Sequence, residues 1–394
     1  MRVLIVASRF PLPPWRGNQV RTTEWLRALA AEDVALVCPS PARSQLVGEL
    51  RRDRLALWTH GSGPVAVGSA LVGSAAGGRP FQEGLYATGS ARRALSRAVR
   101  EHRPDAAIVQ MVRCGWALDQ LGREAPGLPV LFDAIDAMGL HFDRESRFAH
   151  PVLRPLLRAE AGRCRRRERE LAGRAALAVA VSARDLDAIG AESGRVVPVS
   201  GRPVAAPPGG RPGPRVLLSG NLGYRPTVRG AEWFAAEVWP RIASLVPETR
   251  WVLAGARPAA AVRRLGRLPG VEVHGDVADL GPFLASATVA IAPMASGSGV
   301  PMKVLEAWAS GVPVVAHPWT AAGLAADARD ALVVAESAEE WRQGVVALLC
   351  DQPAAARLAE RGRELWRRTY HPEQVDAALR AALVAARSAQ VGCR

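Results

Sequence analysis

Short apolar runs alternate with longer amphipathic stretches along the first 200 residues. The run at 3–7 is followed by a proline-rich loop at 10–18 and by helical spacing at 20–31. Further apolar runs, each reached through a helical stretch, lie at 34–37, 106–110, 129–132 and 176–181. Buried strands that alternate with helices predict a parallel sheet with helices on both faces, which is an α/β fold.

The same alternation restarts after the segment 201–214, which holds five prolines and four glycines and is typical of a linker. Strands are expected at 215–218, 251–254, 271–274, 289–292 and 312–316, and helices at 228–245, with a kink at Pro240, and at 300–309. We therefore predict two doubly wound, Rossmann-like domains, 1–200 and 215–370, that face each other across a cleft. A helix at 371–394 is expected to pack back toward the first domain.

The strongest candidate site is the stretch 295–315, ASGSGVPMKVLEAWASGVPVV, where a strand ends in a Gly/Ser loop that opens a helix. The first amides of a helix have no internal partner and attract anions, and Gly297 and Gly299 let a phosphate approach the backbone. Lys303 is expected one turn into the helix, with Glu306 three residues on. This arrangement predicts a diphosphate at the helix tip and a carboxylate that accepts from ribose hydroxyls.

The overall charge supports a phosphate-containing ligand without selecting one. The formal charge is +14, which favours nucleotides, anionic lipids or nucleic acid. The five cysteines are scattered and predict neither a disulfide framework nor a metal site. The first apolar run is too short for a signal peptide, and no run reaches the about 18 residues of a membrane helix. We expect a cytoplasmic protein whose contact with a membrane, if any, is peripheral.

The stretch GSGVPMKVLEAWASGVPVVAHP resembles the donor-binding signature of the retaining glycosyltransferases of family 4, which have the GT-B fold. Upstream, the segments 218–229, 251–255, 270–279 and 289–293 resemble successive strands and loops of the family's donor domain. At the N-terminus, the prolines at 11–14 with Gly17, Asn18 and Arg21 resemble the glycine loop of its acceptor domain. Asp136 and the segments 160–169 and 181–182 are similar to a bacterial branch associated with cell-surface polysaccharide and glycolipid assembly.

The resemblance implies a transfer from a UDP or GDP sugar that requires neither a cofactor nor a metal ion. In the family, the second Glu of a Glu–seven residues–Glu motif binds the ribose; Glu306 matches it, and Ser298 replaces the first Glu. In relatives, an Arg and a Lys usually bind the diphosphate, and Asn221 and Thr227 occupy about those positions here. Many relatives also carry a His after the strand that corresponds to 129–134, and here Asp136, or else Asp133 or His141, is the candidate for that role. The candidate catalytic residues are Asp136, Lys303 and Arg225, and the candidate donor-binding residues are Gly17, Gly220, Asn221, Arg229, His274, Gly275, Gly297, Ser298, Gly299, Val300 and Glu306.

The expected acceptor is a glycan, a lipid-linked sugar or a small molecule, recognised by the first domain. Eight arginines at 154–174 predict either an anionic membrane surface or a solvated helix face with internal Glu–Arg pairs. Alternative functions are a sugar-nucleotide epimerase of the same fold, an inactive binding protein, or a nucleic-acid-binding protein. For the last, no zinc, RNA-binding or helix-turn-helix pattern is present, so nucleic acid is not an expected partner. The first strand also lacks the glycine fingerprint of a nicotinamide dehydrogenase.

Overall fold

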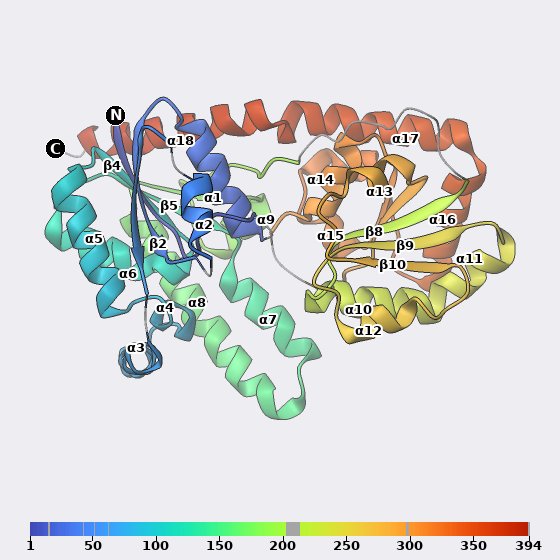
Figure 1. The fold of residues 1–394 in the computed structure, drawn as a ribbon, viewed down its shortest axis with the longest axis horizontal. Coiled ribbons are helices and arrows are strands. Elements are labelled where there is room, and N and C mark those ends of the chain that lie inside the picture. Colours follow the sequence, from blue (N-terminus) through green and yellow to red (C-terminus); the bar gives the residue numbers. More distant parts are fainter. Residues whose placement is uncertain are drawn as a thin grey trace. The chain divides into compact units, whose positions relative to one another are not determined.

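The chain forms two compact α/β units, described here in a computed structural model. The structure describes residues 1–14, 16–41, 43–50, 52–61, 63–201, 213–296 and 299–392. The first unit comprises Met1–Val199 with Val375–Arg394, and the second comprises Ser200–Gln374 (Figure 1). Most of the expected linker, together with Gly297 and Ser298, lies outside the described residues.

Within the described residues, the first unit is built on a seven-stranded parallel sheet of order β3-β2-β1-β4-β5-β6-β7. Its strands are β1 (Arg2–Val6), β2 (Asp33–Pro39), β3 (Leu55–His60), β4 (Ala106–Gln110), β5 (Val130–Ile135), β6 (Leu177–Ala180) and β7 (Arg195–Val196). The central strands β1, β4 and β5 are almost wholly buried, as their uninterrupted apolar runs predict.

Helices cover both faces of this sheet. They are α1 (Gly17–Ala28), α2 (Gln45–Leu50), α3 (Pro64–Ala76), α4 (Phe81–Gly84), α5 (Gly89–His102), α6 (Gly115–Glu124), α7 (Met138–Phe148), α8 (Arg154–Arg174), α9 (Ala183–Ala188) and α18 (Pro372–Gly392). Two short 3₁₀ turns, Val112–Cys114 and Pro151–Leu153, precede α6 and α8. The helix α18 returns from the end of the chain and buries Val375, Leu379 and Leu383 in one core with β1 and α1 (Figure 1).

The second unit repeats this architecture with a six-stranded parallel sheet, in the described residues, of order β10-β9-β8-β11-β12-β13. Its strands are β8 (Arg215–Asn221), β9 (Arg250–Ala256), β10 (Val271–Gly275), β11 (Val289–Ala292), β12 (Val314–Ala316) and β13 (Val333–Val334). Aromatic side chains fill the core on one face, where Trp251 contacts Phe234 and Trp239 at ring-centroid distances of 4.9 and 5.8 Å. The two sheets confirm the predicted pair of Rossmann-like domains.

The helices of the second unit are α10 (Arg225–Trp233), α11 (Trp239–Leu245), α12 (Ala260–Leu265), α13 (Gly281–Ser286), α14 (Met302–Ala309), α15 (Pro318–Ala321), α16 (Ala338–Cys350) and α17 (Gln352–Leu365). A 3₁₀ turn lies at Ala326–Ala331, and π-helical turns lie at Phe234–Val238 and Trp366–Tyr370. The first π turn falls just before Pro240, since proline cannot donate the helical hydrogen bond and α11 restarts there. The kink predicted at Pro240 is therefore present.

Candidate functional site

The sheet of the second unit has a topological switch point between β8 and β11. From β8 the chain continues to β9 on one side, and from β11 it continues to β12 on the other. The loops that follow these two neighbouring strands therefore leave in opposite directions, the arrangement at which open α/β sheets bind ligands beyond the carboxyl ends of their strands. The described residues 222–224 follow β8, and 293–296 and 299–301 follow β11, so the switch point includes part of the stretch singled out in the sequence.

A row of three glycines crosses the carboxyl ends of β8, β9 and β10. Gly220 pairs with Gly255, and Gly255 pairs with Gly275. A Cβ on Gly255 would lie 1.7 Å from the carbonyl oxygen of Gly220, at a φ of +156°, so no side chain fits there. At Gly220 a Cβ would instead lie 3.9 Å from Cε of Lys303, which leaves space beside that amine.

Lys303 is the only lysine in a chain that carries 51 basic residues. It is the second residue of α14, so it lies at the helix start and not one turn in, as the sequence pattern had suggested. Its half-buried Nζ donates to Sδ of Met294 at 3.4 Å. Burial lowers the pKa of Lys303 to about 8, although the nearby Glu306 carboxylate opposes the shift. A cation whose charge is poorly solvated is well placed to gain an anionic partner.

The loop between β11 and α14 adds backbone donors to this position. Gly299 has a φ of +73°, and Pro301 occupies the position before the first helical residue. No side chain caps the start of α14, so its first amides have no side-chain acceptor. Val300 and Glu306 are half-buried on either side of Lys303. The predicted residues Lys303, Glu306, Gly299 and Val300 therefore lie within one turn of the same helix start.

The arginines of α10 differ in their surroundings. Arg229 is half-buried and its Nη2 donates to Oγ of Ser296 at 2.7 Å, which joins α10 to the loop after β11. Arg225 is exposed at the first position of α10. Asn221 uses its Oδ1 to accept from the backbone N–H of Gly223, at 3.0 Å, within the turn after β8. Arg229 is thus already connected to the candidate site, whereas Asn221 shapes the turn.

The predicted donor residues His274 and Gly275 lie at the far end of the glycine row. Their strand β10 is the edge of the sheet, two strands from β8, a separation of about 10 Å. The exposed ring of His274 lies 3.4 Å from the Glu272 carboxylate and packs at a tilt of 49° against Phe283, at a centroid distance of 4.9 Å. These residues border the same carboxyl edge but do not touch Lys303.

In the first unit, the candidate Asp136 follows β5 among buried acidic groups. The residue before it, Ile135, has a φ of +61°, a strained backbone for a β-branched residue. Glu168 accepts from the N–H groups of Met138 and Gly139 at 2.6 and 3.2 Å, so α7 begins on a buried carboxylate. Burial raises the pKa of Glu168 to about 8, and the nearby Asp136 and Asp185 charges add to the rise.

The other two candidates for the polar group near Asp136 are placed differently. Asp133 is fully buried and accepts from Nε of Arg21 at 2.9 Å and from Nε1 of Trp25 at 2.6 Å. It therefore fastens α1 to the sheet. His141 lies within the first turn of α7 near Asp136, and burial lowers its pKa against the effect of that carboxylate. Gly17 begins α1, exposed, with nothing within 4 Å of the position a Cβ would take.

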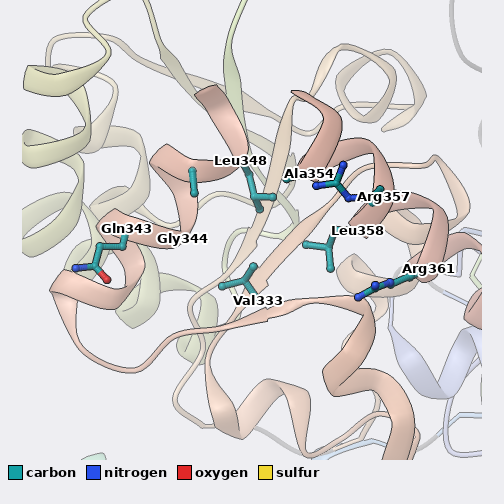
Figure 2. A pocket seen from close by; sticks show the side chains of 9 residues that line it. Val333, Gln343, Gly344, Leu348, Ala354, Arg357, Leu358 and Arg361 are labelled. Carbon is teal, nitrogen blue, oxygen red and sulfur yellow. The ribbon is translucent and has the colours of Figure 1, made fainter. Parts of the chain in front are cut away.

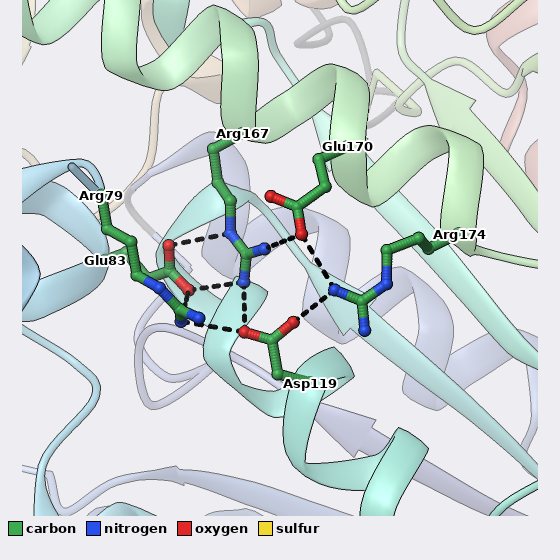
Figure 3. A network of polar contacts seen from close by, with 6 residues as sticks. All are labelled: Arg79, Glu83, Asp119, Arg167, Glu170 and Arg174. Carbon is green, nitrogen blue, oxygen red and sulfur yellow. Dashed lines mark hydrogen bonds and ion pairs between the residues drawn. The ribbon is translucent and has the colours of Figure 1, made fainter. Parts of the chain in front are cut away.

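The arginine-rich segment of α8 is divided between ion pairs and solvent. Arg167 is 4% exposed and binds Glu83 at 2.9 Å and Asp119 at 2.6 Å, and Arg174 binds Asp119 and Glu170 (Figure 3). Outside this network, Arg165 pairs with Asp143 at 2.9 Å. Part of this arginine-rich segment is therefore neutralised, because carboxylates from other parts of the chain form ion pairs with arginines of α8. Arg158, Arg166 and Arg169 are exposed.

Two hollows, one in each unit, are lined by residues other than those of the switch point. The first, of about 470 Å³, is lined by α16, α17 and Val333, with Gln343, Arg357 and Arg361 at its polar positions (Figure 2). The second, of about 500 Å³, lies between the loop after β3 and the start of α5, where Ser90 and Arg93 line it. Among the residues that the structure describes, no group of three or more His, Cys, Asp or Glu side chains could hold a metal ion.

Residues 213–351, which hold the glycine row and Lys303, match the family described as glycosyl transferases group 1. No curated protein matches the chain. The matched segment lies wholly within the second unit.

Solved structures match nearly the whole chain. Sucrose-phosphate synthase from Thermosynechococcus elongatus is 15% identical, with a TM-score of 0.73, and the match covers 97% of this chain and 98% of that one. A glycosyltransferase from Rickettsia africae is 11% identical, with a TM-score of 0.68 and 98% of each chain covered. Anabaena HepE, in complex with UDP and glucose, is 13% identical, with a TM-score of 0.64 and 98% and 99% covered. These likenesses establish the GT-B fold, and with the family match they indicate a glycosyltransferase.

Proposed function

We propose that this protein transfers a sugar, with retention of anomeric configuration, from a UDP or GDP sugar to a hydroxyl of a glycan, a glycolipid or a small molecule. The observation that carries the proposal is the position of Lys303, a single half-buried lysine beside Gly220 at the switch point. The solved structure of HepE with UDP and glucose supports a nucleotide-sugar donor for this fold. A cytoplasmic role in bacterial polysaccharide or glycolipid assembly is part of the same proposal.

In this proposal the diphosphate lies at the start of α14, where the uncapped amides and Lys303 face it. When the bond between the anomeric carbon and the diphosphate oxygen breaks, negative charge grows on that oxygen. Preorganised donors stabilise such charge more in the transition state than in the bound substrate. Arg229 and Arg225 of α10 are the further cations on this side, and Glu306 accepts from the ribose hydroxyls.

The first unit contributes the groups that meet the acceptor. Asp136 follows a strained residue, as functional groups at strand ends often do, and Gly17 leaves the start of α1 open. We assign part of the acceptor to the hollow lined by Ser90 and Arg93, which has a volume of about 500 Å³. Since Ser298 stands where relatives have Glu, we expect the donor sugar to be recognised by other groups than in those relatives.

The test is a calorimetric screen of nucleoside diphosphates and their sugars, followed by NMR analysis of products formed with candidate acceptors. We expect one nucleoside diphosphate to bind, and transfer to give the same anomeric configuration as the donor. An inverted product would contradict retention. Consumption of the donor without acceptor, with an altered sugar, would favour the epimerase alternative.

A further inference from the structure

The end of the first unit formed by α3 and the α7–α8 hairpin exposes an unusual number of large apolar side chains. Four of them, Phe148, Val152, Leu153 and Leu156, occur within nine residues and are 49%, 76%, 50% and 53% exposed. Val65 and Val72 of α3 are 86% and 70% exposed. Exposed large apolar side chains that gather at one place on a soluble domain, as the four of the hairpin do, mark an interaction site. We call these six residues the apolar tip.

Two contacts bring α3 and the hairpin to the same end of the unit. α3 packs on α4, where Gly84 approaches Ser74 so closely that a Cβ would lie 2.7 Å from its Oγ. The first amides of α4, from Phe81 and Gln82, donate to the Glu160 carboxylate of α8 at 3.1 Å each. Glu160 lies four residues, about 6 Å, along α8 from Leu156. Figure 1 shows α3 and the end of the hairpin projecting on one side of the sheet.

The charges within the hairpin turn are basic, although Arg147 pairs with Asp143 at 3.6 Å and Glu145 and Glu160 flank the turn. Residues 146–159 include three arginines, Arg147, Arg154 and Arg158, and no acidic residue. Residues 61–78, which contain α3, include no charged residue at all. An apolar end with a basic border matches a bilayer of anionic lipids, since apolar side chains enter the interface and arginines remain at the headgroups. A second copy of this chain, with a formal charge of +14, would be repelled.

We propose that the apolar tip docks the protein on an anionic membrane surface. No helix in the described part of the chain is long and apolar enough to cross a bilayer. The proposed surface keeps only the start of the arginine-rich segment of α8 that the sequence predicted to meet a membrane, because Arg167, Arg174 and Arg165 are held by carboxylates.

The test is flotation of the full chain, without nucleotide, on vesicles of phosphatidylglycerol and phosphatidylcholine. We expect binding at about 0.1 M salt that weakens at about 1 M, where the Debye length falls from about 10 to about 3 Å. Vesicles of phosphatidylcholine alone should bind less. If the wild type remains in the soluble fraction with anionic vesicles at low salt, the inference is wrong.

Matched substitutions locate the surface. Leu156→Glu should abolish flotation, whereas Leu245→Glu in the second unit, at a site with nearly the same exposure (54% against 53%), should not. Val72→Glu tests whether α3 contributes to vesicle binding, and Val384→Glu on α18 is its control. Equal losses in test and control variants would overturn the inference, and wild-type flotation by Val72→Glu would remove α3 from the surface.

Charge is tested in the same way. Arg158→Glu should weaken binding at low salt by about fivefold or more, since one arginine near an anionic surface contributes about 1 kcal/mol. Arg361→Glu on α17 is the control, and an equal loss there would indicate a nonspecific effect of net charge. Binding of nucleoside diphosphate and the thermal unfolding midpoint are measured for each variant. The flotation result can then be interpreted even if the proposed transferase function is wrong. Self-association abolished by Leu156→Glu, without vesicle binding, would assign the tip to a second copy.

Discussion

The substitution Lys303→Met should stabilise the ligand-free protein while it weakens binding of nucleoside diphosphate. The pKa of Lys303 falls from 10.5 to about 8 because the fold partly removes water from the amine. A shift of this size corresponds to about 3 kcal/mol, which we reduce to about 2 kcal/mol because the side chain is only half-buried. Methionine has a similar length and no charge, so it removes that cost.

The sign of the pH dependence follows from the lowered pKa. Below about pH 8 the amine is charged in both the folded and the unfolded chain, so the full cost of burying the charge is present. Between about pH 8 and 10.5 the folded protein loses the proton first, and the cost disappears. The gain in the free energy of unfolding from Lys303→Met should therefore be largest below pH 8 and vanish above 10.5.

Although it stabilises the ligand-free protein, Lys303→Met should weaken the binding of nucleoside diphosphate. Loss of a charge-assisted hydrogen bond to the diphosphate should cost about 1.5–3 kcal/mol, or about tenfold to 150-fold in Kd. For the wild type, the protonated fraction falls about tenfold between pH 7 and 9, so Kd should rise by up to about tenfold over this range. The Kd of the methionine variant should stay flat.

The assay is direct because Lys303 is the chain's only lysine. Labelling with ¹⁵N-lysine gives a single side-chain signal whose titration reports the pKa with and without UDP or GDP. Urea unfolding gives the stability and calorimetry the Kd. An unshifted pKa near 10.5, or equal Kd values for wild type and variant, would refute the assigned role of Lys303. A gain in stability with no change in Kd would show that Lys303 is a buried cation that does not bind the diphosphate.

Three further outcomes test the same geometry. Glu306→Ala should weaken UDP binding by about 1–3 kcal/mol but leave pyrophosphate binding unchanged, and calorimetry that shows equal losses would remove the ribose contact. Gly255→Ala should destabilise the fold by about 3 kcal/mol in urea unfolding, because its Cβ would meet the Gly220 carbonyl, and a neutral result would disprove the tight strand pairing. The raised pKa of Glu168 should make the wild type lose stability as pH rises from about 4.5 to about 8, and Glu168→Gln should flatten that slope; an unchanged slope would contradict the burial effect.

The central strands and the helix start of the candidate site could be predicted from the sequence, because buried parallel strands are short, uninterrupted apolar runs. The run predicted at 289–292 coincides with β11. The helix start was misplaced by two residues because Pro301 stays outside α14. That small error moved Lys303 from the helix side to its tip.

What the sequence could not show depends on partners that are distant along the chain. Arg167 sits in a basic run typical of a solvated face, yet Glu83 and Asp119 reach it from 84 and 48 residues away. The glycines Gly220, Gly255 and Gly275 are unremarkable separately, and only strand register aligns them. The helix α3 was missed because it carries no polar face from which to recognise a helical period.

Because the chain has a single lysine, at the start of α14, proteolysis can measure the local unfolding of that helix. A protease that cleaves only after lysine has one possible cleavage site in 394 residues, the peptide bond between Lys303 and Val304. In the closed helix that bond is held in regular structure, and Val304 is buried. Cleavage therefore requires α14 to unfold locally, and its rate reports the free energy of that opening when the helix closes faster than the protease cuts. A ligand bound at the helix tip must slow the cut, in proportion to its occupancy, so one pair of fragments on a gel would measure binding without any knowledge of the acceptor.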